Sequence, residues 1–341
     1  GIDLADVSTV RPSEDVRLIQ QNAKKAKRVA VVGSGVIGIE MAGVLKHPGV
    51  DVNLIEYAPS ITPRIADKEY AEKLVSHLKE HGIVTHFGTK LVEIKEHGDA
   101  RELHLEENGE KKTLVVDMVI MAAGVTPNIE IVKGTGIRTS PRGIIADSRM
   151  RTSAPHIYAC GDCAMVASAV TGEYEQSALA SLAIQQSKIV GFQIAGFPIR
   201  YNGSTNAFAF GVLGKEYAAA GLTEEMARKR YRWVVVGRAV TTDLYNDLKA
   251  KQPLEVKLIF AGPRMRLVGY EAFGKGVIAS AEVASFAMGL HLSILSMLKF
   301  NYISHPSLTP WPFMNPIIMA TEDAMGVMMK NIKAFFGMKS A

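Results

Sequence analysis

Cysteine is nearly absent from this sequence, with two residues among 341. So few thiols exclude a disulfide framework and are typical of proteins from a reducing, cytoplasmic compartment. No apolar run reaches the roughly 18 uninterrupted residues of a membrane-spanning helix, and no secretory signal opens the sequence. We therefore expect a cytoplasmic protein without membrane contact.

A strong charge of either sign is also missing, since the formal net charge is only +5. The densest basic run, Lys24–Arg28, directly precedes an apolar strand pattern, which favours a solvated linker over a nucleic-acid surface. The composition, 48% hydrophobic and 21% charged, is that of an ordinary globular protein. The length suffices for two or three domains with ample cores.

What the sequence does contain is a complete dinucleotide-binding pattern. The apolar run Val29–Val32 reads as a buried parallel strand, and it breaks into the G-x-G-x-x-G loop Gly33–Gly38. A helical pattern from Ile39 to Lys46 follows, and a second strand, Asp51–Ile55, ends at the acidic residue Glu56. Strand, glycine loop, helix, second strand and acid in this order make the motif specific.

Each residue type in this pattern has a physical task. Gly33 permits the tight turn, Gly35 lets the backbone approach a pyrophosphate, and Gly38 lets helix and strand pack closely. The helix N-terminus offers free N–H groups to the phosphates. Glu56 can accept hydrogen bonds from ribose hydroxyls and repels a 2′-phosphate, which favours NAD over NADP. The predicted NAD(H) site comprises Gly33, Gly35, Val36, Ile37, Gly38 and Glu56.

Further along the chain, the periodicity predicts a helix over 67–81 and three alternating strands at 91–95, 102–105 and 113–116. A buried strand over 118–124 ends at Gly124. The pattern changes after Gly143, where a short strand at 157–159 precedes a long apolar helix over 176–195. From about residue 201 the chain reads as α+β.

Three motifs in this order resemble those of the pyridine nucleotide–disulfide oxidoreductases, which are flavoproteins that bind two dinucleotides. They are the fingerprint with Glu40 two residues after its third glycine, the strand 119–128 (VIMAAGVTPN), and the segment 152–162 (TSAPHIYACGD). The resemblance covers nearly the whole chain and is strongest to the NADH oxidase and coenzyme A-disulfide reductase branch.

The resemblance implies an α/β fold and roles for four further residues. Glu40 would lie near the nicotinamide end, and Gly124 would close the NAD site. Asp162 would accept a hydrogen bond from the ribityl chain of FAD, with Gly161 allowing its close approach. The implied domains are the end of a first FAD-domain segment (1–24), the NAD(P)-binding domain (25–140), a second FAD-domain segment (141–200) and a C-terminal interface domain that forms a homodimer (201–341).

The implied activity is hydride transfer from NADH to FAD, and then electron transfer to a small disulfide or sulfur species or to dioxygen. Two alternatives remain open: a reductase of a small redox protein such as rubredoxin, and a non-enzymatic NAD-binding module. Members of this family carry an FAD fingerprint and a redox cysteine first in the chain. Neither stands in residues 1–341, so we expect both in a segment outside this sequence.

Two residue pairs have alternative interpretations. Cys160 and Cys163 form a C-x-x-C that could be a redox dithiol or half a metal site. Because no second C-x-x-C exists and the pair overlaps the Gly161-Asp162 motif, a structural role is favoured. His77 and His81 have metal-ligand spacing on a helix, but a solvated helix face is the favoured interpretation, and no metal site is predicted.

The last part of the chain supplies weaker candidates. His305 lies in a segment (HPSLTP) that resembles the loop where disulfide reductases place an acid/base histidine, but the partner acid is missing, so it is only a weak catalytic candidate. Tyr302 could help to close the site. For the apolar tail residues, a core or dimer contact is favoured over peripheral membrane contact; these residues are Met319, Met325, Met328, Met329, Phe335 and Phe336.

Overall fold

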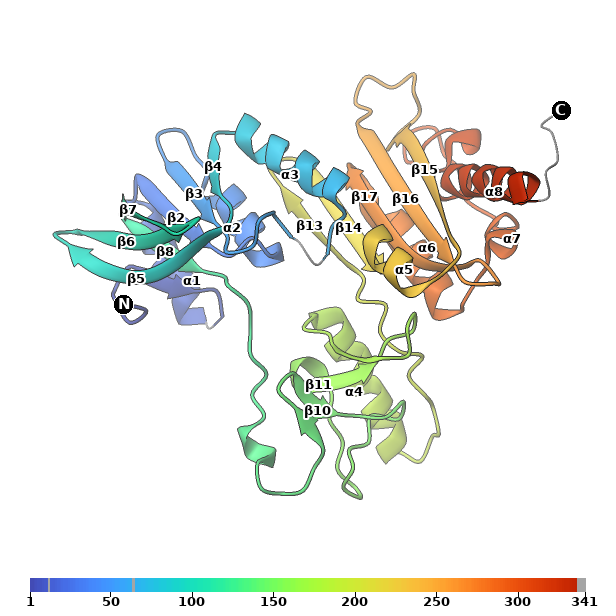
Figure 1. Ribbon diagram of the computed structural model, residues 1–341, viewed down its shortest axis with the longest axis horizontal. Coiled ribbons are helices and arrows are strands. Elements are labelled where there is room, and N and C mark those ends of the chain that lie inside the picture. Colours follow the sequence, from blue (N-terminus) through green and yellow to red (C-terminus); the bar gives the residue numbers. More distant parts are fainter. Residues whose placement is uncertain (12, 63–64, 336–341) are drawn as a thin grey trace. The chain divides into compact units, whose positions relative to one another are not determined.

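A computed structural model describes residues 1–11, 13–62 and 65–335 (Figure 1). Its contacts divide the chain into two compact units. The first unit contains residues 1–125 and 210–215, and the second contains residues 126–209 and 216–341. No helix within the described residues combines the length and the apolar character needed to cross a membrane.

The first unit is built on a five-stranded parallel sheet in the order β1-β8-β2-β3-β4. Its strands are β1 (Val7–Thr9), β2 (Arg28–Val32), β3 (Asp51–Ile55), β4 (Ile83–His86) and β8 (Met118–Met121). Its helices are α1 (Ser13–Ala23), α2 (Val36–Leu45) and α3 (Lys68–Glu80). This is the predicted Rossmann-type arrangement, and α3 agrees with the predicted helix over 67–81.

An antiparallel meander covers one face of this sheet, as the alternating pattern predicted. It consists of β5 (Thr89–His97), β6 (Ala100–Glu107) and β7 (Glu110–Val116). Ala30 and Val32 of β2 point into a core shared with Leu103 and Val116 of the meander. The predicted strand over 118–124 ends earlier, at Met121, so that residues 122–124 leave the sheet.

The second unit opens with a four-stranded sheet and one helix. The sheet order is β12-β11-β10-β9, formed by β9 (Thr139–Ser140), β10 (Gly143–Ile145), β11 (Ala164–Ala167) and β12 (Tyr174–Gln176). The 3₁₀ turns η1 (Glu130–Val132) and η2 (Gly161–Cys163) belong to the same region.

Two predictions for this region were wrong in their boundaries. The helix predicted over 176–195 is α4 (Ala180–Ile194), because residues 174–176 pair with β11 instead of entering the helix. The strand predicted over 157–159 is reduced to a single bridge between Arg151 and Tyr158. In both places antiparallel pairing with a segment about ten positions away or fewer decided the local structure.

A second, five-stranded sheet in the order β13-β14-β17-β16-β15 forms the α+β part. Its strands are β13 (Phe208–Val212), β14 (Lys215–Gly221), β15 (Val234–Thr242), β16 (Pro253–Ala261) and β17 (Arg266–Gly274). The helices and turn that accompany it are α5 (Glu224–Arg230), α6 (Val277–Gly289), α7 (Ile294–Met297), η3 (Pro312–Met314) and α8 (Pro316–Phe335).

Helices α6 and α8 pack against one face of this sheet and share its apolar core. The approach of α8 is very close, since a Cβ on Gly237 of β15 would lie 1.8 Å from the Ala320 carbonyl oxygen. Met319, Met325 and Met328 pack against the core. Met329 and Phe335 are exposed at 46% and 83%, and Phe336 lies outside the described residues.

Candidate functional site

The glycine loop joins β2 to α2 in a conformation that only glycine allows at two positions. Gly33 has φ of +103°, and a Cβ there would lie 2.3 Å from the Ala122 carbonyl oxygen. A Cβ on Gly38 would lie 1.9 Å from the Gly33 carbonyl oxygen. The loop therefore folds back on the first turn of the helix with no room for a side chain.

Gly35 is different, because a Cβ at this position would meet nothing within 4 Å. It is the N-cap of α2 and offers no side-chain cap. The first N–H groups of a helix have no intrahelical partner, and at this helix those groups belong to Val36, Ile37 and Gly38. Free N–H groups and an uncrowded backbone suit a phosphate anion.

A cavity of about 550 Å³ opens beside this loop, at the carboxyl ends of the parallel strands. Parallel α/β sheets bind their ligands at this edge. Four predicted site residues contribute to its lining, namely Gly33, Gly35, Glu56 and Gly124. The other four residues predicted for the NAD site, which all belong to α2, do not line this cavity; they are Val36, Ile37, Gly38 and the half-buried Glu40. The lining residues that sequence reasoning missed include Ser34, Tyr57, Thr89, Lys90 and Leu91.

Glu56 makes hydrogen bonds that the sequence did not reveal. Its Oε2 accepts from the backbone N–H and the hydroxyl of Ser34, both at 2.8 Å, and its Oε1 accepts from the Ala58 N–H at 2.7 Å. The carboxylate thus ties the glycine loop to the segment after β3. A carboxylate has about four acceptor positions, so Glu56 keeps capacity for a ribose hydroxyl.

The second motif lies in the 3₁₀ turn η2 of the second unit. Gly161 has φ of +75°, and its N–H donates to Oε1 of Gln186 at 2.8 Å. The Asp162 carbonyl oxygen accepts from Nε2 of Gln176 at 3.0 Å. The Asp162 side chain is exposed. Leu179, the N-cap of α4, provides no side-chain cap, so the first N–H groups of α4 remain available to a ligand.

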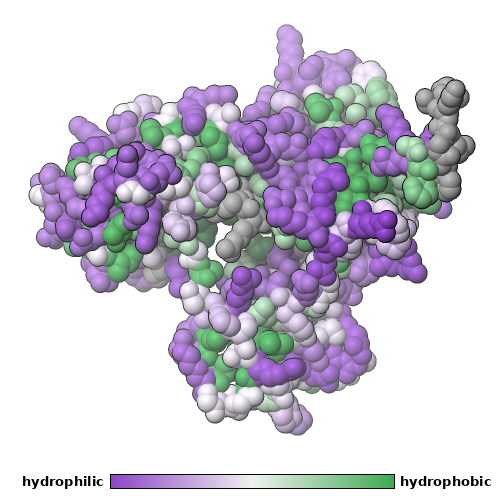
Figure 2. Space-filling model, viewed as in Figure 1, coloured by the Kyte–Doolittle hydropathy of each residue, from purple (hydrophilic) through white to green (hydrophobic). Residues whose placement is uncertain are grey.

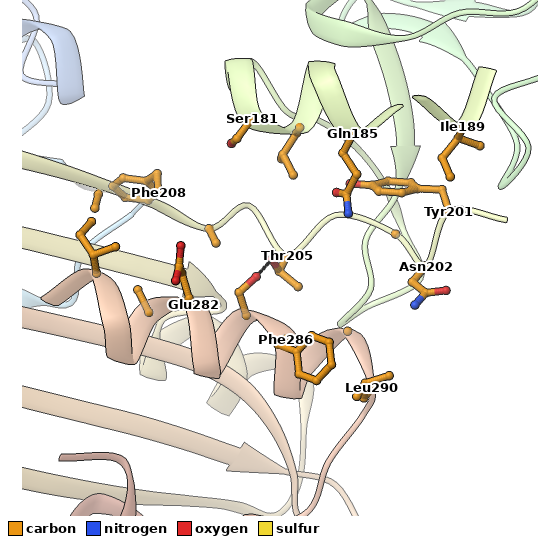
Figure 3. Close-up of a pocket in the computed structure, with 18 of the residues that line it drawn as sticks. Ser181, Gln185, Ile189, Tyr201, Asn202, Thr205, Phe208, Glu282, Phe286 and Leu290 are labelled. Carbon is orange, nitrogen blue, oxygen red and sulfur yellow. Dashed lines mark hydrogen bonds between the residues drawn. The ribbon is translucent and has the colours of Figure 1, made fainter. Parts of the chain in front are cut away.

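A larger cavity of about 680 Å³ lies between α4, the segment 200–209 and α6 (Figure 3). Gln185 points into it from α4, and Phe286 of α6 and Leu290, the C-cap of α6, also line it. Its rim carries one carboxylate, Glu282, and the hydroxyls of Thr205 and Ser285, which lie 2.7 Å apart. None of the predicted site residues lines this mostly apolar cavity.

The two cysteines are free thiols, each half-buried. Burial, and to a lesser degree the neighbouring Cys163, raises the pKa of Cys160. The Cys163 thiol donates to the Cys160 carbonyl oxygen at 3.5 Å. A raised pKa keeps a thiol protonated and weakly nucleophilic, in keeping with the structural role favoured for the C-x-x-C.

His77 is buried, with 7% of its surface exposed, so the predicted solvated helix face is wrong for this residue. Its Nε2 bonds the carbonyl oxygens of Val212 and Leu213 at 3.1 and 3.2 Å, and its ring lies against that of His81. Burial is the main cause that lowers the pKa of His77. Among the described residues, no group of three or more His, Cys, Asp or Glu side chains could hold a metal ion.

His305 lies in an exposed loop after α7. Its Nδ1 lies 3.2 Å from the Ser307 hydroxyl and 3.3 Å from the Ser307 N–H. Within the described part of the chain no carboxylate bonds its ring, so the acid partner of an acid/base histidine is missing from the structure as it is from the sequence. The catalytic role of His305 stays a prediction. Tyr302 is 37% exposed in the same loop.

Two family models match the chain. The model described as pyridine nucleotide-disulphide oxidoreductase matches residues 2–187, and the model of its dimerisation domain matches residues 208–312. An NADH oxidase of Methanocaldococcus jannaschii is 33% identical over 330 residues, which is 95% of this chain and 72% of that protein.

Solved structures agree with these matches. An NAD-dependent persulfide reductase from A. fulgidus has a TM-score of 0.88 at 27% identity, covering 96% of this chain and 60% of that one. A ferredoxin reductase from Rhodopseudomonas palustris has a TM-score of 0.65 at 28% identity, covering 80% of this chain and 62% of that one. This chain thus spans less than two thirds of either solved chain.

Both halves of the sequence match the same family. The predicted cofactors, FAD and NAD(H), agree with the NADH oxidase and with an FAD-dependent pyridine nucleotide-disulphide oxidoreductase from Desulfovibrio vulgaris that is 26% identical. The chain belongs to the pyridine nucleotide-disulphide oxidoreductases, as an NAD(P)H-dependent flavin oxidoreductase.

Proposed function

We propose that the protein oxidises NADH through FAD and passes the electrons to a small disulfide or sulfur species or to dioxygen. The observation that carries this proposal is the uncapped glycine loop, whose cavity gathers Gly33, Gly35, Glu56 and Gly124 at one sheet edge. The names of two similar proteins, an NADH oxidase and a persulfide reductase, support these acceptors.

The proposed domains follow the implied division: NAD binding by residues 25–140, FAD binding by 1–24 with 141–200, and dimerisation by 201–341. In the NAD site, the N–H groups of Val36, Ile37 and Gly38 would bind the pyrophosphate. Glu56 would bind the adenosine ribose and disfavour a 2′-phosphate. Glu40 would lie toward the nicotinamide end.

In the FAD site, Asp162 would orient the ribityl chain and the N-terminus of α4 would face the flavin. When bound, the flavin accepts a hydride and returns electrons to an acceptor. The residues of this chain bind and orient the two cofactors and exclude water. The sequence holds a single G-x-G-x-x-G, so the loop for the FAD pyrophosphate is not among residues 1–341.

We also propose a homodimer formed through the segment that matches the dimerisation domain. Large apolar side chains are exposed there, including Phe286 at 71%, Ile303 at 86% and Leu308 at 73%. Figure 2 shows hydrophobic residues at the surface of the second unit among hydrophilic ones. Burial of such side chains between two copies would stabilise a dimer.

The test is a spectroscopic half-reaction with the full-length protein. NADH added without oxygen should bleach the visible flavin band, and the true acceptor should restore it within the turnover time. The rate at which the flavin band returns would be compared for dioxygen, coenzyme A disulfide and a glutathione persulfide, with the already reduced form of each acceptor as the blank. A protein that contains flavin but is not reduced by NADH would refute the proposal.

A second candidate is a reductase of a small iron–sulfur or rubredoxin-type protein, favoured by the similarity to a ferredoxin reductase. It shares the first half-reaction and differs in the acceptor. Reoxidation of the reduced flavin by such a protein, but not by dioxygen or disulfides, would select this candidate. A protein that binds NADH but never contains flavin would instead be an NAD-binding module.

A further inference from the structure

We propose that Gln186 and Gln176 are positioning residues that aim the Asp162 carboxylate at the flavin. The two side chains are called the glutamine clamp below. The inference rests on the proposed role of Asp162 in FAD binding and adds residues that neither the family motifs nor the sequence pattern assign.

Gln186 is an unusual helix residue, because it is the one fully buried member of α4 within the described residues, with 1% of its surface exposed. Burying an amide is costly unless its polar atoms are bonded. Its Oε1 accepts from the Gly161 N–H at 2.8 Å. The hydrogen bond that compensates for the burial of Gln186 therefore fixes the backbone N–H of the residue before Asp162.

Gln176 holds the other side of the same turn. It is the last residue of β12, and its Nε2 donates to the Asp162 carbonyl oxygen at 3.0 Å. One bond therefore ends on the Gly161 N–H and the other on the Asp162 carbonyl oxygen. The backbone dihedrals of Gly161 and Asp162, which set the direction of the carboxylate, lie between these two fixed points.

The clamp acts beside two other bonds of the turn, from the Ala164 N–H to the Gly161 carbonyl oxygen and from the Cys163 thiol to the Cys160 carbonyl oxygen. Gly161 adopts a left-handed φ of +75°, and glycine is the residue with the most conformational freedom to lose. The Asp162 side chain is exposed, so packing does not aim it. Binding groups on a turn are effective when neighbouring bonds hold them close to the productive geometry.

A purely structural role would predict a different result. If the two glutamines only satisfy buried polar atoms, their loss should lower stability and weaken every ligand to the same extent. If they position Asp162, FAD binding should weaken while NADH binding at the glycine loop of the other unit is unchanged. The ratio of the two affinities separates these explanations.

The experiment uses the full-length protein stripped of flavin, with FAD and NADH dissociation constants measured by calorimetry. Gln176→Glu keeps the side-chain shape but removes the donated hydrogen bond, and Gln186→Met removes the acceptor. Gln185→Met is the matched control, since this neighbouring residue points into the cavity beside α4 (Figure 3). Thermal unfolding reports any loss of stability.

We expect FAD binding to weaken roughly tenfold to hundredfold in Gln186→Met, because Gln186 is buried, and roughly threefold to tenfold in Gln176→Glu, because the bond from Gln176 is exposed. NADH binding and the Gln185→Met control should stay within twofold of the parent. FAD binding equal to the control in both variants would overturn the clamp while leaving the proposed function intact. A parent protein that binds no FAD would overturn the proposed function and the clamp with it.

Discussion

Two glycines of the same loop should differ in how an added methyl group affects folding. At Gly35 the backbone has φ of −72° and ψ of −177°, which any residue adopts, and a Cβ meets nothing within 4 Å. At Gly38 a Cβ would lie 1.9 Å from the Gly33 carbonyl oxygen. Gly35→Ala should therefore spare folding and impair NADH binding, whereas Gly38→Ala should impair both.

The expected magnitudes follow from these contacts. In Gly35→Ala, the unfolded chain has less conformational freedom, which raises the free energy of unfolding by about 0.4–1 kcal/mol. Alanine is also a poorer N-cap than glycine, which lowers the free energy of unfolding by a similar amount. The net change in the free energy of unfolding should be near zero. For Gly38→Ala, the backbone of the loop must move, and overpacking of this kind costs about 1–3 kcal/mol or more.

The effect on the ligand has a separate cause. An alanine methyl at Gly35 would occupy the space through which the backbone approaches the pyrophosphate. Displacing the phosphate breaks hydrogen bonds to a charged group, each worth about 1.5–3 kcal/mol. NADH should therefore bind roughly tenfold to hundredfold more weakly to Gly35→Ala.

Urea unfolding and calorimetric titration with NADH measure the two effects on the same samples. Gly49→Ala is not a suitable control because Gly49 has φ of +81°, whereas Gly326→Ala in α8 adds a methyl to open space far along the chain. Unchanged NADH affinity in Gly35→Ala would refute the assignment of this loop to the pyrophosphate. Unchanged stability in Gly38→Ala would refute the packing argument.

Three further predictions concern carboxylates. Glu56→Gln should raise the affinity for NADPH relative to NADH, because it removes the charge that repels a 2′-phosphate; an unchanged ratio of dissociation constants would exclude Glu56 as the selecting residue. Burial raises the pKa of Glu175 to about 7, against 4.5 for a free carboxyl, with a smaller contribution from Glu173. A raised folded-state pKa gives stability that is present below pH 4.5 and lost as the pH rises through 7. Glu175→Gln should therefore flatten the fall in unfolding free energy between pH 5 and 8, by about 1–2 kcal/mol after allowance for solvent screening; an equally steep fall in the variant would contradict this. Burial alone would raise the pKa of Glu216, but the ion pair with Lys275 and the N–H groups of Val277 and Gly276 hold it below the usual range. This stabilisation exists above the ordinary carboxyl pKa and disappears in acid, so Glu216→Gln should cost stability at pH 7 and nothing at low pH in urea titrations; a loss that persists in acid would point to packing instead.

The fold class and the NAD loop were predictable because their signals are local. A buried strand, a glycine loop and a helix are consecutive in the chain. A Cβ on Gly33 or on Gly38 would collide with a backbone carbonyl oxygen, of Ala122 or of Gly33, so both positions require glycine. The meander was predictable for the same reason, because alternating apolar and polar residues indicate a strand and the short turn sequences between them indicate where each strand ends. These elements agree with the structure apart from their ends.

Elements that depend on partners in other segments were not predictable. The helix predicted over 176–195 begins only at Ala180, because Gln176 ends a strand that pairs with β11. His77 reads as a solvated helix residue, but the turn that follows β13, more than a hundred positions away, accepts its hydrogen bond and buries it. Periodicity carries no information about such partners.

The glycine loop, the acid Glu56 and the Gly161-Asp162 motif could be recognised in the sequence, because such motifs have particular residue types at fixed spacing. The tertiary structure alone decided how those residues are held. It bonded Glu56 to Ser34 and Ala58, and it placed Gln176 and Gln186 on the two sides of Asp162. A glutamine on a helix or at a strand end is ordinarily solvated. Only the folded chain shows that the amides of these two glutamines form hydrogen bonds with backbone groups of another segment.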